Sequence, residues 1–227
     1  MTRKLYELAN VESPFVWRAK YALAHKGLTY ESERLPFTQI SPGFGNGGFK
    51  TVPVLVEEDG EEIHDSWAIA KHLDAAYPQA PTLLGDGLER AQAVESLLGK
   101  VGFRNFLPIF IKDIHDGLAS ADAVYFRENR EARFGDTLEN LSADRDVRLP
   151  QAREALGPLR AELADAQWLH GDAPGYGDYI WLGFFAWLTG CASCALLLDD
   201  DPLKAYIERG FALFDGVAHG ISSRAGA

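Results

Sequence analysis

The first third of the chain alternates between strand-like and helix-like segments, and this order limits the folds that the chain can adopt. Residues 4–9 have the length and composition of a strand. Ser13 and Pro14 then form a helix start, and Gly27 forms the matching helix end. Residues 29–35 alternate between polar and apolar side chains, as in a half-exposed strand. The pattern predicts strand, helix, strand.

The next segment predicts a hairpin and a second helix. Residues 36–50 contain four glycines and an interior proline, which is typical of a long irregular loop. Residues 52–56 and 61–64, joined by a Glu-Asp-Gly turn, predict a β-hairpin. A helix follows, capped by Asp65 or Ser66. The order β-α-β followed by β-β-α is the thioredoxin arrangement.

Strand signals stop after residue 78, and long helical patterns take over. Breakers concentrate in residues 79–87, so we predict a linker there, between a thioredoxin-like α/β domain over residues 1–78 and an all-helical domain over residues 88–227. The helical patterns cover residues 88–106, 121–134, 146–166, 178–189 and 202–214.

Composition argues against several partners. The formal net charge of −11 opposes binding to nucleic acid or anionic lipid, and we expect neither nucleic acid nor membrane as a partner. The apolar residues 179–198 are interrupted by glycines and hydroxyl residues, which favours a buried helix over a membrane span. Two cysteines exclude a disulfide framework and favour a reducing cytoplasm. Cys191 and Cys194 are interpreted as packing residues, and no metal is expected because the histidines are scattered.

Ser13 is the first candidate for chemistry, since it ends the first strand and begins the first helix. A thiolate held there would meet main-chain N–H groups and the positive end of the helix dipole, and the hydroxyl could donate a hydrogen bond to the sulfur. Such donors lower a thiol pKa from about 8.5 by roughly one to several units. The alternative is that Ser13 is simply the helix cap.

Two further pairs of residues occupy useful positions. A cis bond between Val52 and Pro53 would turn the main-chain groups of Val52 outward, where an extended peptide could pair with them. The alternative is an ordinary trans proline that opens an edge strand. Asp65 and Ser66 at the start of a helix could hold an ammonium and a carboxylate group, or could serve only as a cap.

Together these features offer a group for a thiol, a strand for a peptide and a pocket for an amino-acid head group, which are the three parts of glutathione. The chain resembles the cytosolic glutathione transferases over essentially its whole length. It looks most similar to the bacterial β-aryl etherases and their fungal etherase-like relatives. The segments that carry the resemblance are residues 13–18 (SPFVWR), 50–55 (KTVPVL), 65–69 (DSWAI) and 170–178 (HGDAPGYGD).

The resemblance implies a role for each candidate. Ser13 would stabilise the glutathione thiolate as the catalytic residue. Val52, with Pro53 beside it, would pair with the cysteinyl main chain, and Asp65 with Ser66 would hold the γ-glutamyl end.

The resemblance also implies contacts with glutathione for three residues whose sequence positions alone do not indicate a binding role. Lys50 would neutralise the glycyl carboxylate, with Gln39 as a second candidate, and Asn10 would add a donor near the sulfur. A pocket between the domains would take the acceptor. The aromatic residues suggested for that pocket are Phe15, Phe103, Phe106, Phe110 and Tyr125.

The family's second signature is a capping box that opens a buried helix of the helical domain. This chain has Gly175 where the family usually has Ser or Thr, and it keeps Asp178. Because glycine supplies no side-chain bond, we expect a weaker cap, with Asp178 in a structural role.

The resemblance thus implies a cytoplasmic, homodimeric glutathione S-transferase. Glutathione would be the co-substrate, and the second substrate an electrophilic, hydrophobic aromatic molecule such as a β-aryl ether. A non-catalytic carrier of glutathione or of aromatic ligands is the alternative.

Overall fold

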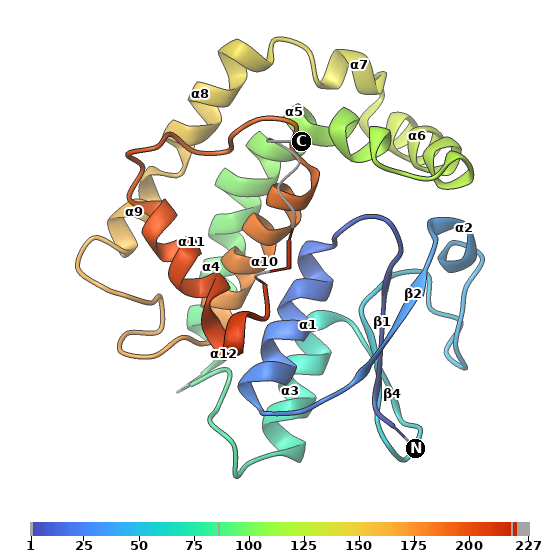
Figure 1. The fold of residues 1–227 in the computed structure, drawn as a ribbon, viewed down its shortest axis with the longest axis vertical. Coiled ribbons are helices and arrows are strands. Elements are labelled where there is room, and N and C mark those ends of the chain that lie inside the picture. Colours follow the sequence, from blue (N-terminus) through green and yellow to red (C-terminus); the bar gives the residue numbers. More distant parts are fainter. Residues whose placement is uncertain (1, 86, 219, 222–227) are drawn as a thin grey trace.

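The computed structural model describes residues 2–85, 87–218 and 220–221, and it shows a small sheet beside a group of helices (Figure 1). The end of the predicted helical domain, residues 222–227, lies outside the described residues. The elements that form the N-terminal part are β1 (Lys4–Leu8), α1 (Pro14–His25), β2 (Glu31–Leu35), α2 (Phe37–Ile40), β3 (Val54–Val56), β4 (Glu62–His64) and α3 (Ser66–Ala76). The elements that follow are α4 (Leu88–Leu97), the π-helical η1 (Leu98–Phe103), α5 (Arg104–Asp116), α6 (Ser120–Phe134), α7 (Leu138–Leu141), α8 (Arg145–Ala155), α9 (Gly157–Glu162), α10 (Tyr176–Cys191), α11 (Leu203–Phe211) and α12 (Leu213–Gly216).

The sheet has the strand order β2-β1-β3-β4. β1 runs parallel to β2 and antiparallel to β3, and the hairpin partner β4 pairs with β3. Leu5 of β1 lies opposite Leu55 of β3, and both are fully buried. Helices α1 and α3 cover the sheet face that is turned towards the helical part (Figure 1). This arrangement confirms the predicted thioredoxin-like fold.

The segment predicted to be an irregular loop contains a one-turn helix. α2 occupies Phe37–Ile40, directly after Pro36, and Phe44 pairs with Phe49 in an isolated bridge. The Thr38 main-chain N–H and hydroxyl both donate to the Asp122 carboxylate of α6, at 3.0 and 3.1 Å. The helix therefore depends on a contact with a distant segment, which local sequence cannot reveal.

The first helix of the helical part is longer than predicted. α4, η1 and α5 follow one another without a break from Leu88 to Asp116, past the expected end near residue 106. Pro108 lies inside α5, and the widened π-helical turn η1 precedes it. Proline removes one helical hydrogen bond, but the buried apolar face of α5 holds the helix together.

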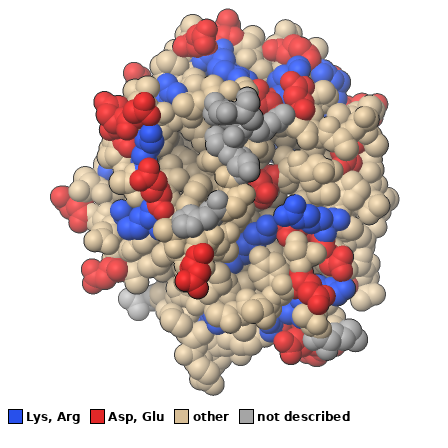
Figure 2. Space-filling view, in the orientation of Figure 1, with Lys and Arg blue, Asp and Glu red and all other residues tan. Residues whose placement is uncertain are grey.

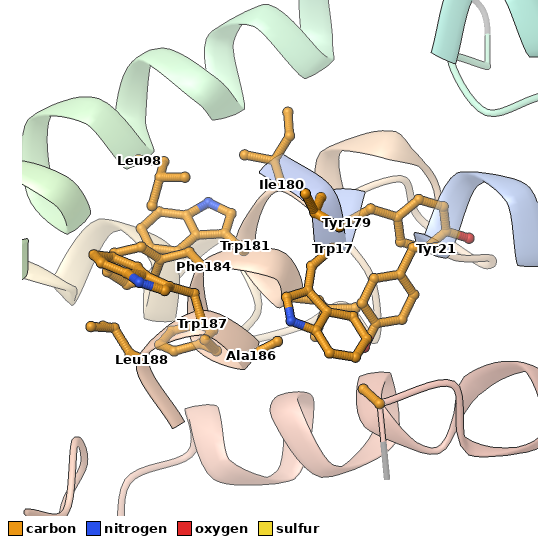
Figure 3. Packing of buried hydrophobic residues seen from close by; sticks show 14 of the residues in the cluster. Trp17, Tyr21, Leu98, Tyr179, Ile180, Trp181, Phe184, Ala186, Trp187 and Leu188 are labelled. Atoms are coloured by element: carbon orange, nitrogen blue, oxygen red, sulfur yellow. The ribbon is translucent and has the colours of Figure 1, made fainter. Parts of the chain in front are cut away.

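The two parts meet where α1 packs along α10. Tyr21 and Tyr179 stack with their ring centroids 5.2 Å apart. Figure 3 shows Trp17 and Tyr21 beside Tyr179 and Ile180, with the indole rings of α10 farther along the same core. A Cβ atom on Gly183 would lie only 2.6 Å from the Pro14 carbonyl oxygen, so glycine is required for this close approach.

α10 is the buried helix that the sequence predicted, and nearly all its residues are buried. Among the described residues, no helix combines the length and apolar character needed to cross a bilayer.

Candidate active site

Ser13 occupies the N-cap of α1, immediately before Pro14, as predicted. Its hydroxyl oxygen accepts a long hydrogen bond of 3.4 Å from the Val16 main-chain N–H. The side chain is buried, and it lines a cavity. Asn10 lies between two residues of the cavity wall, Leu8 and Val11, and has a φ of 64°, which Asn tolerates better than most residues. The N-terminus of α1 therefore opens onto a cavity.

The cavity has a volume of about 150 Å³ and lies between the two parts of the chain. Its walls are mostly apolar, and two arginines lie on one side. The residues that line it are Leu8, Val11, Glu12, Ser13, Pro14 and Phe37 from the N-terminal part, and Phe103, Leu107, Ile114, Phe126, Arg130, Arg133 and Trp187 from the helices. A larger cavity of about 300 Å³ is formed only by residues between Thr189 and Phe211, so it does not reach Ser13.

Of the five aromatic residues suggested for the acceptor pocket, Phe103 lines the cavity. The suggestion is wrong for Phe106 and Phe110, which are fully buried in the helical core. Phe15 lies outside this cavity, half exposed, and stacks on Phe103 with centroids 5.9 Å apart. Tyr125 contacts Phe37 on the cavity wall without lining the cavity itself.

The Val52–Pro53 peptide bond is cis. The edge-strand alternative is wrong, because β3 lies between β1 and β4. Within the described part of the chain, the main-chain groups of Val52 form no hydrogen bond. Lys50 is exposed and forms no ion pair with the described residues, so its charge is open to a ligand.

Asp65 and Ser66 begin α3 in different environments. The Asp65 carboxylate accepts from the Trp67 and Ala68 main-chain N–H groups at 2.9 and 3.3 Å, both through Oδ1. Its φ of 83° is unusual for a residue other than glycine, and such strain is often found at functional sites. Ser66 is buried, and its hydroxyl lies near that of Tyr176 without a geometrically well-formed hydrogen bond among the described residues. The capping role is therefore present, and one oxygen of each side chain remains available.

A partly buried ion pair links α1 and the start of α3 to α4 of the helical part. Arg18 of α1 is fully buried and lies 2.6 Å from Glu95 of α4. Trp67 donates its indole N–H to the same carboxylate. Burial raises the pKa of Tyr176, whose hydroxyl lies near Ser66. Since a buried charge is costly without a partner, Glu95 fixes Arg18 and with it the wall beside Ser66.

Gln39 is exposed on α2, and its side chain forms no hydrogen bond with the described residues. Sequence reasoning missed Arg130, Arg133 and Phe126, all on α6. The signal was available, since these residues are spaced four and three apart and so share one helix face.

At the N-terminus of α10, one side chain of the helix, Asp178, accepts hydrogen bonds from main-chain and side-chain donors around it. The Asp178 carboxylate accepts from the Gly175 and Leu169 N–H groups at 3.0 and 2.8 Å, and from the Tyr206 hydroxyl at 3.1 Å. A Cβ on Gly175 would lie 2.6 Å from the His170 ring, so glycine stands there because the ring occupies the space. Asp178 is fully buried and reaches no cavity described here, which fits its expected structural role.

Two family descriptions match the chain. "Glutathione S-transferase, N-terminal domain" matches residues 12–76, and "Glutathione S-transferase, C-terminal domain" matches residues 91–194. Glutathione transferase GST 23 of Zea mays is 30% identical over 182 residues, which span 78% of this chain and 68% of the relative. Glutathione S-transferase U22 of Arabidopsis thaliana is 26% identical over 186 residues, which span 81% and 73% of the two chains.

Solved structures share the fold. The glutathione S-transferase CsGST63524 of Ceriporiopsis subvermispora, in complex with glutathione, superposes with a TM-score of 0.78 at 23% identity, covering 96% of this chain and 98% of its own. Glutathione transferase GSTFuA2 of Phanerochaete chrysosporium gives 0.74 at 23% identity, covering 98% and 99%. At this identity the likeness concerns the fold.

Proposed function

The chain belongs to the glutathione S-transferase family, and we propose that it is a member that activates glutathione with Ser13. Membership confirms the resemblance to the cytosolic glutathione transferases. The observation that carries the proposal is the position of Ser13, at the N-terminus of α1 and on the wall of the cavity between the two parts. Glutathione is the co-substrate on this proposal, in keeping with the glutathione complex of the Ceriporiopsis relative.

The chemistry begins with the thiol. Ser13 donates its hydroxyl hydrogen to the sulfur, while its oxygen keeps the weak bond from the Val16 N–H. The α1 dipole adds positive potential at the same point. Both effects favour the thiolate over the thiol and lower the thiol pKa from about 8.5 towards neutrality.

The rest of glutathione lies along the sheet end on this proposal. Val52 pairs with the cysteinyl main chain, with Pro53 fixing its direction, because its own main-chain groups have no other partner in the described chain. Ser66 and the second oxygen of Asp65 hold the γ-glutamyl end. Lys50 faces the glycyl carboxylate with an unpaired charge.

The acceptor is an electrophilic aromatic molecule in the cavity, whose walls carry Phe37, Phe103 and Trp187. The sulfur attacks the electrophilic carbon and forms a carbon–sulfur bond. With a β-aryl ether, the carbon–oxygen bond breaks, the phenolate leaves with the electron pair, and it takes up the proton that the thiol released. The active form on this proposal is a cytoplasmic homodimer.

Replacement of Ser13 tests the proposal. Ser13→Ala should reduce kcat with a chloronitroarene on the order of tenfold to a hundredfold, because one hydrogen bond to an anion is lost. The KM for glutathione should change by less than about threefold, since the tripeptide keeps its other contacts. Ser13→Thr retains a hydroxyl and should retain part of the activity. Ser96→Ala, at an exposed serine of α4, is the matched control.

Absorbance at 240 nm as a function of pH reports the bound thiolate directly. The thiol pKa in the glutathione complex should rise in Ser13→Ala and stay low in Ser96→Ala. An unchanged pKa in Ser13→Ala would contradict the role of Ser13. Glutathione binding without turnover of a chloronitroarene or a chromogenic β-aryl ether would favour the carrier alternative, and phenol release would support etherase activity.

A further inference from the structure

Two arginines of α6 form an uncompensated positive group on the cavity wall. Arg130 and Arg133 line the cavity together with Phe126, and Arg130 lies over the Phe126 ring at 4.7 Å. Neither arginine is within ion-pair distance of a carboxylate in the described part of the chain. The chain carries 33 acidic and 22 basic residues, so this positive group belongs to a protein whose overall charge is negative.

Arg127 on the same helix shows what a structural arginine looks like here. It lies 2.8 Å from Glu131 and 2.8 Å from Glu139, so its charge is neutralised within the fold. By contrast, Arg130 has a neutral partner, the side-chain oxygen of Asn129, which takes one of its five N–H groups. The remaining donors stay available to a ligand.

Two carboxylates lie on or near the cavity wall, and neither forms an ion pair with Arg130 or Arg133 in the described part of the chain. Glu12 lines the cavity, with its Cγ beside Gly190 of α10. Asp122 lies on α6, where its Oδ1 accepts from Thr38 and its buried Oδ2 has no hydrogen-bond partner among the described residues. Burial and the charge of Arg133 lower the pKa of Arg130, which is the expected effect of a cation without an anionic neighbour. In the view of Figure 2, acidic and basic side chains are interspersed over much of the surface, and one continuous basic group lies right of the centre.

We propose that Arg130 and Arg133 form an anion subsite of the acceptor cavity, so that the preferred acceptors are aromatic electrophiles carrying a carboxylate. The inference rests on the proposed function for the identity of the reacting thiol. The ring lies against Phe103, Phe126 and Trp187, and the carboxylate accepts hydrogen bonds from the guanidinium groups. In the conjugation, the carbon–sulfur bond forms, chloride or phenolate leaves with its electron pair, and the carboxylate is unchanged.

The test uses two electrophiles that differ in one substituent, the charged carboxylate of 4-chloro-3-nitrobenzoate and the neutral amide of 4-chloro-3-nitrobenzamide. The wild-type protein should have the lower KM for the benzoate. In the double variant Arg130→Gln/Arg133→Gln, the KM for the benzoate should rise on the order of tenfold or more, while the values for the benzamide and for glutathione stay within about twofold. Arg104→Gln, at an exposed arginine of α5 outside the cavity, is the matched control and should leave the preference unchanged.

Calorimetry with the unreactive 3-nitrobenzoate and 3-nitrobenzamide separates this inference from the proposed function. If neither chloronitro compound reacts but 3-nitrobenzoate binds more tightly and the double variant loses that difference, the subsite stands and the transferase proposal fails. If turnover occurs with the same preference in wild type and double variant, the subsite is wrong and the transferase proposal stands. Arg130→Lys keeps a charge and should keep part of the preference, which guards against a loss caused by misfolding; circular dichroism checks the fold.

Discussion

The N-termini of α1 and α10 lie in one interface and have opposite designs. At α10, one buried carboxylate accepts three hydrogen bonds, from Gly175, Leu169 and Tyr206. At α1, one hydroxyl accepts a single long bond from Val16, and the space in front of it is a cavity. The hydrogen-bonding groups at the N-terminus of α10 are therefore satisfied within the fold, while the N-terminus of α1 leaves main-chain donors available to a ligand. Unmet hydrogen-bonding capacity, more than the presence of a cap, distinguishes the site from the scaffold.

The strongest test of this contrast removes the carboxylate at α10. Asp178→Ala should destabilise the protein by about 3 kcal/mol or more, because two main-chain N–H groups and a tyrosine hydroxyl lose their buried acceptor. Urea unfolding measures the change. Asp172→Ala, at an exposed aspartate of the preceding loop, should cost little. A small effect at Asp178 would mean that the α10 terminus is no more satisfied than that of α1.

A second test concerns the missing hydroxyl at α10. Gly175→Ser restores the usual cap of the family, yet it should destabilise the protein by about 1–2 kcal/mol, because its Cβ meets the His170 ring. In a His170→Ala background, the same substitution should be neutral or stabilising. Thermal unfolding of the two single variants and the double variant gives the coupling, and additivity would argue that the ring is not the obstacle.

A third test uses pH. Burial lowers the pKa of His170 below its ordinary value of 6.5, with the charge of Arg90 acting in the same direction. The unfolded chain therefore binds a proton below pH 6.5 that the folded chain refuses, so stability should fall as the pH drops from 6.5. His170→Gln should show a shallower fall between about pH 7.5 and 5.5 in urea titrations. An equal slope would contradict the assignment.

The smallest effect is expected at α1. Ser13→Ala should cost less than about 1 kcal/mol of stability, since the bond from Val16 is long and the helix keeps its packing against α10. Urea unfolding beside Asp178→Ala gives the comparison. A loss as large as that of Asp178→Ala would indicate that Ser13 belongs to the scaffold.

The sequence predicted the parts of the fold that short-range chemistry determines. Ser13, the hairpin turn and the Asp65 cap each specify their own element within a few residues, so their positions were readable without the rest of the chain. α2 and the continuation past Pro108 were not readable, because Asp122 and the α5 core stabilise them from a distance. The start of an element is determined by nearby residues, whereas the length of a helix depends on tertiary contacts.

The same distinction between local and tertiary determinants applies to the site. The side of the cavity that contains Ser13 is formed by the end of one strand and the cap of the next helix. The opposite wall is formed where α6, α5 and α10 meet, which the sequence alone does not show. Phe106 and Phe110 were therefore suggested for a cavity that they do not line, and Arg130, which lines it, was overlooked. An aromatic residue in a helix gives no sign of which neighbour it will face, but an arginine that shares a face with Phe126 does offer a clue.

The glycine at position 183 limits which helical parts can be joined to this N-terminal part in a chimeric protein. Because α10 lacks a side chain at that point, it touches the carbonyl beside Ser13. A chimera that joins this N-terminal part to another helical part would displace Pro14, and with it Ser13, unless the other helical part also has glycine at that point. The position of the Ser13 hydroxyl thus depends on residues from both parts of the chain.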